Sequence, residues 1–140
     1  MKKTTLILLI FSLLIACESK NEGPSFSKEN AHEMIKEFYQ ALSTGDSTLM
    51  SSVLSLQFEM YEHEVLWNED SLLWLMGATQ GRIWRVDEIT FHEEGKFAHA
   101  YYYNESDKPL GRSWYESMLF KKEGDEWKIR FMHSTKRYLK

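Results

Sequence analysis

The chain has 140 residues, of which 43% are hydrophobic, 14% are aromatic and 27% are charged, and its net charge is −4. This length suits one domain with a hydrophobic core, and the apolar content excludes a disordered stalk. The acidic balance argues against a nucleic-acid partner, because such proteins gather lysine and arginine into basic surfaces.

The first 17 residues have the features of an export signal. Two lysines precede an almost unbroken apolar run over residues 6–15. That run is shorter than the ~20 residues that a membrane-spanning helix needs, but it suits the hydrophobic part of a signal peptide. It ends in LIAC (residues 14–17), which resembles the lipobox of bacterial lipoproteins. The resemblance implies cleavage after residue 16 and lipidation of Cys17.

This resemblance predicts both the location and the organisation of the chain. Two or more acyl chains on Cys17 would anchor the protein stably to a membrane of the bacterial cell envelope, with the domain in the periplasm or at the cell surface. Glu18 is not the aspartate that retains some lipoproteins at the inner membrane, which favours the outer membrane. We therefore expect a signal peptide (residues 1–16), a lipidated cysteine and tether (17–26) and one domain (27–140). Cys17 is the only cysteine, so the domain has no intramolecular disulfide.

The first half of the domain has mainly helical patterns. Ser27 suits a helix N-cap, apolar residues then recur at three- and four-residue spacing, and Gly45 suits the C-terminal end of that helix. Asp46 can cap a second, shorter helix. Residues 54–61 alternate like a half-buried strand, with Leu54, Leu56, Phe58 and Met60 on one face. Residues 63–68 are predicted to form a loop and residues 69–80 a third helix.

The second half predicts four strands, over residues 83–93, 96–103, 113–122 and 126–134. The alternation slips in the first of them, which predicts a bulge near residues 87–88. A polar turn spans residues 104–112, and a short hairpin connection spans residues 123–125. Helices followed by strands with short turns predict an α+β domain, with N-terminal helices packed on a curved antiparallel sheet.

Two segments resemble the nuclear transport factor 2-like (NTF2-like, also SnoaL-like or cystatin-like) superfamily. FYQALSTGD (residues 38–46) is similar to its helix end, and FKKEGDEWKI (120–129) is similar to its closing hairpin. The resemblance implies a cone-like fold whose concave side can hold a ligand. Members include enzymes, carriers and scaffolds, so the fold does not decide the function.

The enzyme of this superfamily with the clearest chemistry is ketosteroid isomerase, which needs a carboxylate base and a tyrosine–acid pair around an oxyanion. The position that resembles its first-helix tyrosine is Phe38, and Tyr39 lies about 100° further round the helix. Glu62 lies near the place of the base, but in a polar Glu-His-Glu run. These departures favour a domain without catalytic residues.

The sequence has no motif that indicates a metal site, a catalytic nucleophile or a phosphate-binding loop. The histidines at 63, 92 and 99 have neighbouring glutamates but no zinc-type spacing, which predicts no metal site. The single cysteine is assigned to lipid, and the chain has neither a Gly-x-Ser-x-Gly elbow nor a glycine-rich phosphate loop. We expect no cofactor.

A ligand site on the concave face would use aromatic and polar residues from the helix and strands. The candidates are Phe38, Phe58, Trp114, Glu116, Phe131 and His133. The alternative is that Glu116 faces water and pairs with Arg130, while His133 lies at a frayed strand end. We favour this alternative for the two polar residues, because an unpaired buried carboxylate is costly.

The sequence therefore predicts a lipid-anchored envelope protein whose non-catalytic domain binds a small apolar ligand or a partner protein. One alternative is an isomerase-like enzyme that acts on a hydrophobic small molecule. Another is a structural or assembly protein. At least one of Tyr101, Tyr102 and Tyr103 must project from the outer face of the sheet, where tyrosine would suit a homodimer interface.

Overall fold

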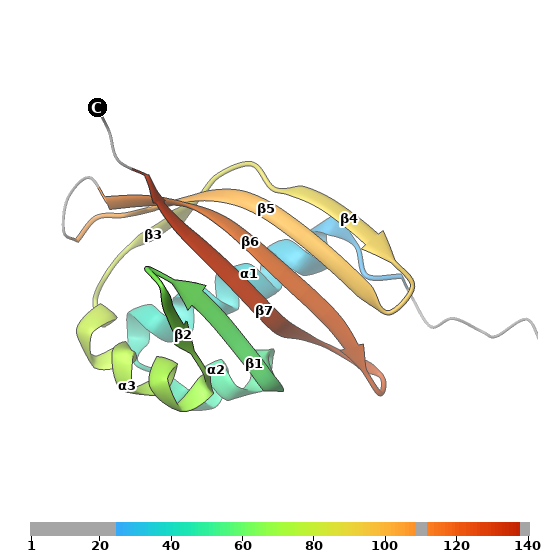
Figure 1. Ribbon diagram of the computed structural model, residues 1–140, viewed down its shortest axis with the longest axis horizontal. Helices are drawn as coiled ribbons and strands as arrows, with labels where there is room; N and C mark the ends of the chain where they lie inside the picture. Colours follow the sequence, from blue (N-terminus) through green and yellow to red (C-terminus); the bar gives the residue numbers. More distant parts are fainter. Residues whose placement is uncertain (1–24, 109–111, 138–140) are drawn as a thin grey trace, which may run out of the picture.

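The computed structural model describes residues 25–108 and 112–137, so the signal peptide and the lipidation of Cys17 fall outside the described residues. The elements in chain order are α1 (Lys28–Thr44), α2 (Ser47–Val53), β1 (Leu54–Glu62), β2 (Val65–Trp67), α3 (Glu69–Thr79), β3 (Trp84–Val86), β4 (Thr90–Glu94), β5 (Phe97–Ser106), β6 (Arg112–Glu123) and β7 (Glu126–Arg137). Figure 1 shows the strands as one strongly curved, open sheet.

The sheet has seven strands, in the order β2-β1-β7-β6-β5-β3, and β4 also pairs with β5. Its strand pairs are antiparallel, apart from β1 and β7, which run parallel. The predicted α+β class, with helices on a curved sheet, is confirmed. The sheet is mixed rather than purely antiparallel, because the C-terminal strand β7 lies between β1 and β6 and runs parallel to β1.

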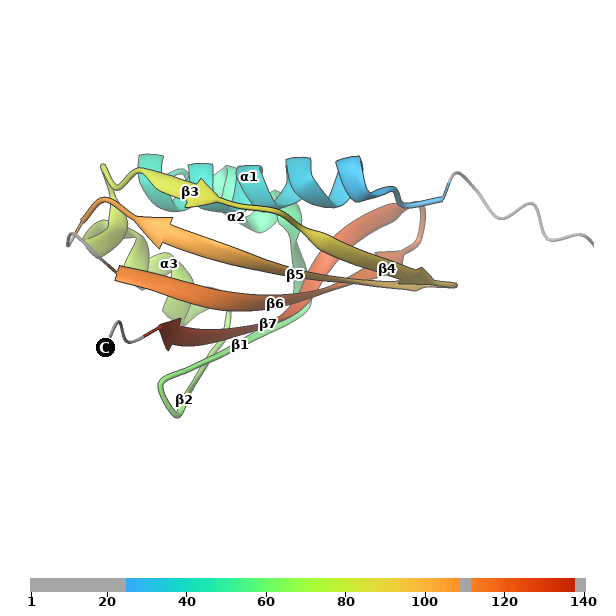
Figure 2. The same ribbon diagram turned by 90° about the horizontal axis from the view of Figure 1, so that it is seen from above.

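The helices cover the concave side of the sheet. α1 and α2 lie over one face, and α3 packs at the end of the fold beside β1 and β2 (Figures 1 and 2). Ser27 begins α1, since its Oγ accepts a hydrogen bond from the Asn30 N–H at 3.2 Å. Gly45 ends it in the left-handed conformation, with φ +72°. Asp46 Oδ1 accepts from the Leu49 N–H at 2.9 Å and begins α2, so these predicted boundaries are confirmed.

The hydrophobic core lies between the helices and the sheet, and it begins before the first helix. The ring of Phe26 stacks on Trp127 with centroids 4.5 Å apart, and its side chain is 4% exposed. Its backbone N–H donates to Glu93 Oε1 at 2.9 Å. Phe26, which the sequence predicts in the tether, is therefore part of the packed domain. No helix in the described residues is long and apolar enough to cross a membrane.

The sequence predicts a loop over residues 63–68, but the structure has β2 within this range. His63 and Glu64 take positive φ angles of 50° and 65°, which form a tight turn between β1 and β2. The register between β1 and β7 also shifts after Leu54, so the alternation within β1 is broken. Leu56, predicted to face the core, is 95% exposed as a result.

The strand expected over residues 83–93 is two strands. β3 and β4 both pair with β5, and the residues between them leave the ladder. Ile89 lies in this interruption and turns its side chain into the core. The slip in alternation is thus a break between strands rather than a single bulge.

A bulge in β7 reverses which of its side chains face the helices. Phe120 pairs with Ile129 whereas Leu119 pairs with Phe131, so Arg130 is an extra residue on β7. Beyond it, Met132 is buried against the core, as Ile129 is before it. Each residue after the bulge therefore occupies the opposite face from the one that strict alternation predicts.

Candidate functional site

A cavity of about 180 Å³ lies between the helices and the concave face of the sheet. Its apolar walls come from α1, α3, β1 and β7, and are formed by Phe38, Leu42, Met60, Leu72, Leu75 and Met132. A cavity of about 150 Å³ with such walls is known to bind benzene. The space therefore suits a molecule the size of one substituted ring.

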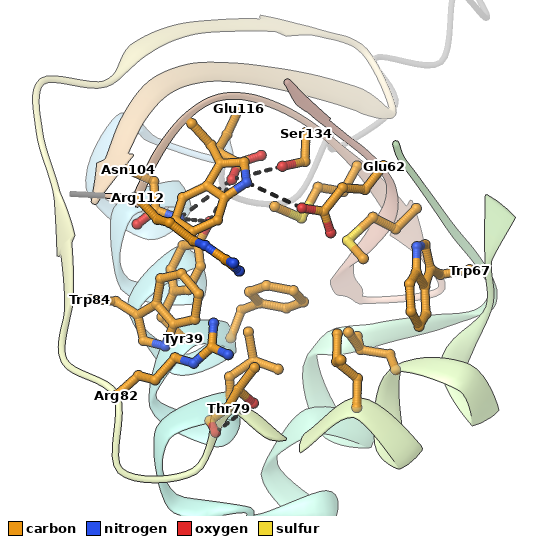
Figure 3. Close-up of a pocket in the computed structure, with 17 residues that line it drawn as sticks. Tyr39, Glu62, Trp67, Thr79, Arg82, Trp84, Asn104, Arg112, Glu116 and Ser134 are labelled. Carbon is orange, nitrogen blue, oxygen red and sulfur yellow. Dashed lines mark hydrogen bonds between the residues drawn. The ribbon is translucent and has the colours of Figure 1, made fainter. Parts of the chain in front are cut away.

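One side of the cavity carries a buried hydrogen-bond network centred on Glu116, in the middle of β6 (Figure 3). Glu116 Oε1 accepts from Ser134 Oγ at 3.2 Å, from Asn104 Nδ2 at 3.4 Å and from Tyr39 Oη at 3.5 Å. Asn104 Nδ2 also donates to Tyr39 Oη at 3.0 Å, and the hydroxyl groups of Tyr39 and Tyr102 lie 3.2 Å apart. The network thus joins α1 to β5, β6 and β7.

The surroundings of Glu116 favour the protonated form of its carboxyl group. Burial raises its pKa to about 8, and the charge of Glu62 adds to that increase, while the donors from Asn104, Ser134 and Tyr39 oppose it. These donors converge on Oε1, which leaves Oε2 as the oxygen that can carry the proton of the neutral form. Glu116 Oε2 is itself buried and has no hydrogen-bond partner among the described residues. In its neutral form Glu116 therefore has an O–H group without a partner in the wall of the cavity.

The two tyrosines of the network stay neutral and act as hydroxyl groups. Burial and the nearby Glu116 carboxyl raise the pKa of Tyr39 and that of Tyr102 well above the usual value. Each hydroxyl can therefore donate one hydrogen bond and accept others over the whole physiological pH range.

A second carboxyl group, Glu62, borders the same cavity from the end of β1. Its Oε1 accepts a hydrogen bond from the indole N–H of Trp114 at 3.1 Å and lies 3.7 Å from Nε2 of His63. Its side chain is 20% exposed. Two acidic groups in different surroundings thus share one cavity, the arrangement that separates acid from base roles in many active sites.

The predicted ligand residues fall into three groups. Phe38, Trp114 and Glu116 line the cavity. Phe58 is buried in the core but is not among the lining residues. Phe131 and His133, expected on the concave face, lie on the opposite face, because the bulge at Arg130 shifts them out of phase.

The favoured reading of Glu116 as a water-facing residue paired with Arg130 is wrong. Glu116 is 5% exposed, and Arg130 instead contacts Glu59, with Nη1 3.3 Å from Oε2. The cost of the buried carboxyl is limited by protonation and by three donors rather than by an ion pair.

The sequence reading missed other cavity residues. Tyr39 lies about 100° round the helix from Phe38, but both face the interior because α1 is buried over a broad arc. The sequence predicts Asn104 in a turn, but the residue continues the period-two row of Ala98, Ala100 and Tyr102 on β5, and that pattern could have located it. Ser134 could not, since only the bulge turns it inward.

Within residues 25–108 and 112–137, no group of three histidine, cysteine or acidic side chains is placed to hold a metal ion.

Comparisons with known proteins support the fold. No protein-family model matches the sequence, and no curated protein is similar to it. Among solved structures, a Nostoc punctiforme protein of unknown function with a cystatin-like fold is 11% identical, with a TM-score of 0.71 over 81% of this chain and 93% of that one. A provisionally assigned ketosteroid isomerase from Shewanella frigidimarina is 19% identical, with a TM-score of 0.66 over 75% and 94%.

A provisionally assigned dehydratase of the NTF2-like family from Streptomyces avermitilis is 14% identical, with a TM-score of 0.67 over 76% of this chain and 93% of that one. Identities this low carry no information about activity, but the alignments cover most of each protein. The chain has the NTF2-like, or cystatin-like, fold.

Proposed function

We propose that the domain binds a small, mainly apolar molecule of about one ring that carries an oxygen acceptor. The observation that carries this proposal is the buried Oε2 of Glu116, which has no partner among the described residues and belongs to a side chain that lines an apolar cavity. An unsatisfied buried donor costs about 1–3 kcal/mol, which a ligand oxygen would recover. Apolar walls with a few fixed polar groups are the usual composition of a small-molecule site.

The test compares two probes of nearly equal shape, acetophenone and ethylbenzene, titrated into the protein and followed by backbone amide NMR shifts. Acetophenone should bind about tenfold more tightly, because it alone can accept the Glu116 hydrogen bond. Glu116→Met should remove this preference, whereas Glu116→Gln, which keeps a donor, should retain much of it. Equal binding of the two probes to the wild-type protein would refute the proposal.

Proton transfer next to a carbonyl group is a second candidate function, favoured by the presence of Glu62 in the same cavity. In this reaction Glu62 takes a proton from the carbon beside the carbonyl, and Glu116 donates a hydrogen bond to the carbonyl oxygen as negative charge develops on it. The proton then returns from Glu62 to carbon. This division between a carboxylate base and a neutral acid is the one used by ketosteroid isomerase.

The same probe separates binding from catalysis. In deuterated buffer, an enzyme of this kind would exchange the methyl protons of acetophenone for deuterium faster than buffer alone. Loss of the base in Glu62→Gln should then slow the exchange by about 10²- to 10⁴-fold, while acetophenone still binds. If bound acetophenone exchanges its methyl protons only at the buffer rate, the domain binds the molecule without catalysing proton transfer.

We also propose that the chain is anchored to the cell envelope through lipid on Cys17. The support is the resemblance of residues 14–17 to a lipobox, after a short apolar run with a basic start. Mass spectrometry of the mature protein should find an N-terminal acylated cysteine. Cys17→Ser should move the protein out of the detergent-soluble membrane fraction. An unmodified Cys17 in the membrane fraction would contradict the proposal.

A further inference from the structure

The groups around the cavity that lack a partner are mostly hydrogen-bond donors. The indole N–H groups of Trp67 and Trp84 are buried without a partner among the described residues, and the protonated Oε2 of Glu116 adds a third donor. Asn104 Oδ1 is the unpaired acceptor. A ligand that carries acceptor oxygens is suited to such a set.

The charge of the cavity is opposite to that of the chain. Arg82 and Arg112 both line it, and Glu62 is the acidic lining residue that can balance them once Glu116 is protonated. The site therefore has an excess of positive charge in a protein whose net charge is −4. Figure 3 shows both guanidinium groups extending into the space enclosed by the lining side chains.

Neither arginine is neutralised by an acid in the part of the chain that the structure describes. Arg82 donates from Nη2 to the Ala78 carbonyl at 3.0 Å, and its guanidinium lies 5.8 Å from the centre of the Trp84 ring. These contacts fix its direction and leave its other N–H groups available. The nearby Asp107 accepts from the Ile83 N–H at 2.8 Å and forms no ion pair with Arg82.

Arg112 approaches from a different element. It is the first residue of β6 and pairs with Ser106 of β5, two residues beyond Asn104. The two guanidinium groups thus reach the cavity from the segment after α3 and from the sheet. Two convergent guanidinium groups beside apolar walls are suited to a planar anionic headgroup with an apolar body.

We propose that the ligand of this cavity is a small carboxylic acid, whose carboxylate is bound by Arg82 and Arg112 and whose apolar body lies against Phe38 and Leu72. This inference rests on the proposed function and specifies its ligand class. It requires no change of covalent bonds. The other source of an anionic headgroup is a phosphate, and the test distinguishes the two.

The experiment titrates benzoate, benzamide and phenyl phosphate into the same protein. Benzoate and benzamide have nearly the same shape, so their difference reports the charge. Benzoate should bind at least tenfold more tightly than benzamide, and added salt should reduce that difference because it screens the arginines. Arg82→Gln and Arg112→Gln should each weaken benzoate by about tenfold and should weaken acetophenone much less, because acetophenone carries no charge.

Arg85→Gln is the matched control, because Arg85 lies on β3, three residues after Arg82, and does not line the cavity. It should leave benzoate affinity unchanged. Equal binding of benzoate and benzamide, or an equal loss with Arg85→Gln, would overturn the inference. If phenyl phosphate binds more tightly than benzoate, the headgroup of the ligand is a phosphate and the inference of a carboxylate is overturned. Acetophenone binding that depends on Glu116, without a benzoate preference, would refute this inference alone and leave the proposed function standing.

Discussion

Glu62 and Glu116 border the same cavity from different strands, and the charge on Glu62 adds to the burial that raises the pKa of Glu116 to about 8. The usual value is 4.5, so between these two pH values the folded protein binds more protons than the unfolded chain. The free energy of unfolding should therefore fall as the pH rises.

Deprotonation of Glu116 should lower the free energy of unfolding by on the order of a few kcal/mol between about pH 5 and pH 8. Urea unfolding at several pH values measures it. Glu116→Gln removes the titrating group, so the difference between the two curves isolates its contribution from that of the histidines. Parallel curves for the two proteins would show that Glu116 is not held neutral.

Tyr39→Phe should raise the pKa of Glu116 further, because burial remains and one donor to Oε1 is lost. It should also lower the free energy of unfolding by about 1–3 kcal/mol, since Asn104 and Tyr102 lose their shared hydroxyl partner. Carbon NMR of the Glu116 carboxyl follows the first effect and urea unfolding the second. Tyr101→Phe, at an exposed position on the outer face, is the control and should change neither.

Gly45→Ala and Gly77→Ala should change stability in opposite directions. Gly45 has φ +72°, and a Cβ there would lie 3.3 Å from Nε2 of Gln80, so alanine should cost about 1 kcal/mol. Gly77 lies within α3, with no atom within 4 Å of a Cβ, so alanine should stabilise the protein by roughly 0.5–1 kcal/mol. Thermal unfolding of both variants gives the comparison, and a shift of the same sign in both would be inconsistent with this account.

Phe26→Ala should destabilise the domain by about 3–5 kcal/mol, because the ring is buried against Trp127 and Phe120. Leu56→Ala removes a side chain that is 95% exposed and should change the free energy of unfolding by less than about 0.5 kcal/mol. Urea unfolding of both variants tests whether the domain begins before its first helix. A small effect of Phe26→Ala would show that this residue belongs to the tether and not to the packed domain.

Much of the fold could be predicted from local chemistry. Ser27, Gly45 and Asp46 mark helix ends through hydrogen bonds to nearby backbone atoms, so the spacing of a few residues is enough to find them. The closing hairpin could be predicted in the same way from the glycine at position 124. This residue takes a positive φ of 63° in the turn between β6 and β7. These features depend on neighbours in the sequence.

The site could be predicted only in part, because its geometry depends on register between distant strands. Trp114 and Glu116 share a phase on β6, and the structure keeps them on one face. Phe131 and His133 had the same kind of pattern on β7, but one extra residue at Arg130 moved both to the other face. Nothing in the local sequence specifies that bulge, which arises from pairing with β6 and β1 together.

The parallel pairing of β1 with β7 also constrains how the chain folds. Leu54 meets Ile129, so the first strand of the sheet acquires its inner neighbour only when nearly all of the domain has been synthesised. Contacts this distant in sequence slow folding, because a long loop must close before they form. Until then the edges of β1 and β6 are both open to other chains, and a chain that ends before β7 keeps them open permanently. Premature termination should therefore produce aggregates rather than a smaller soluble domain.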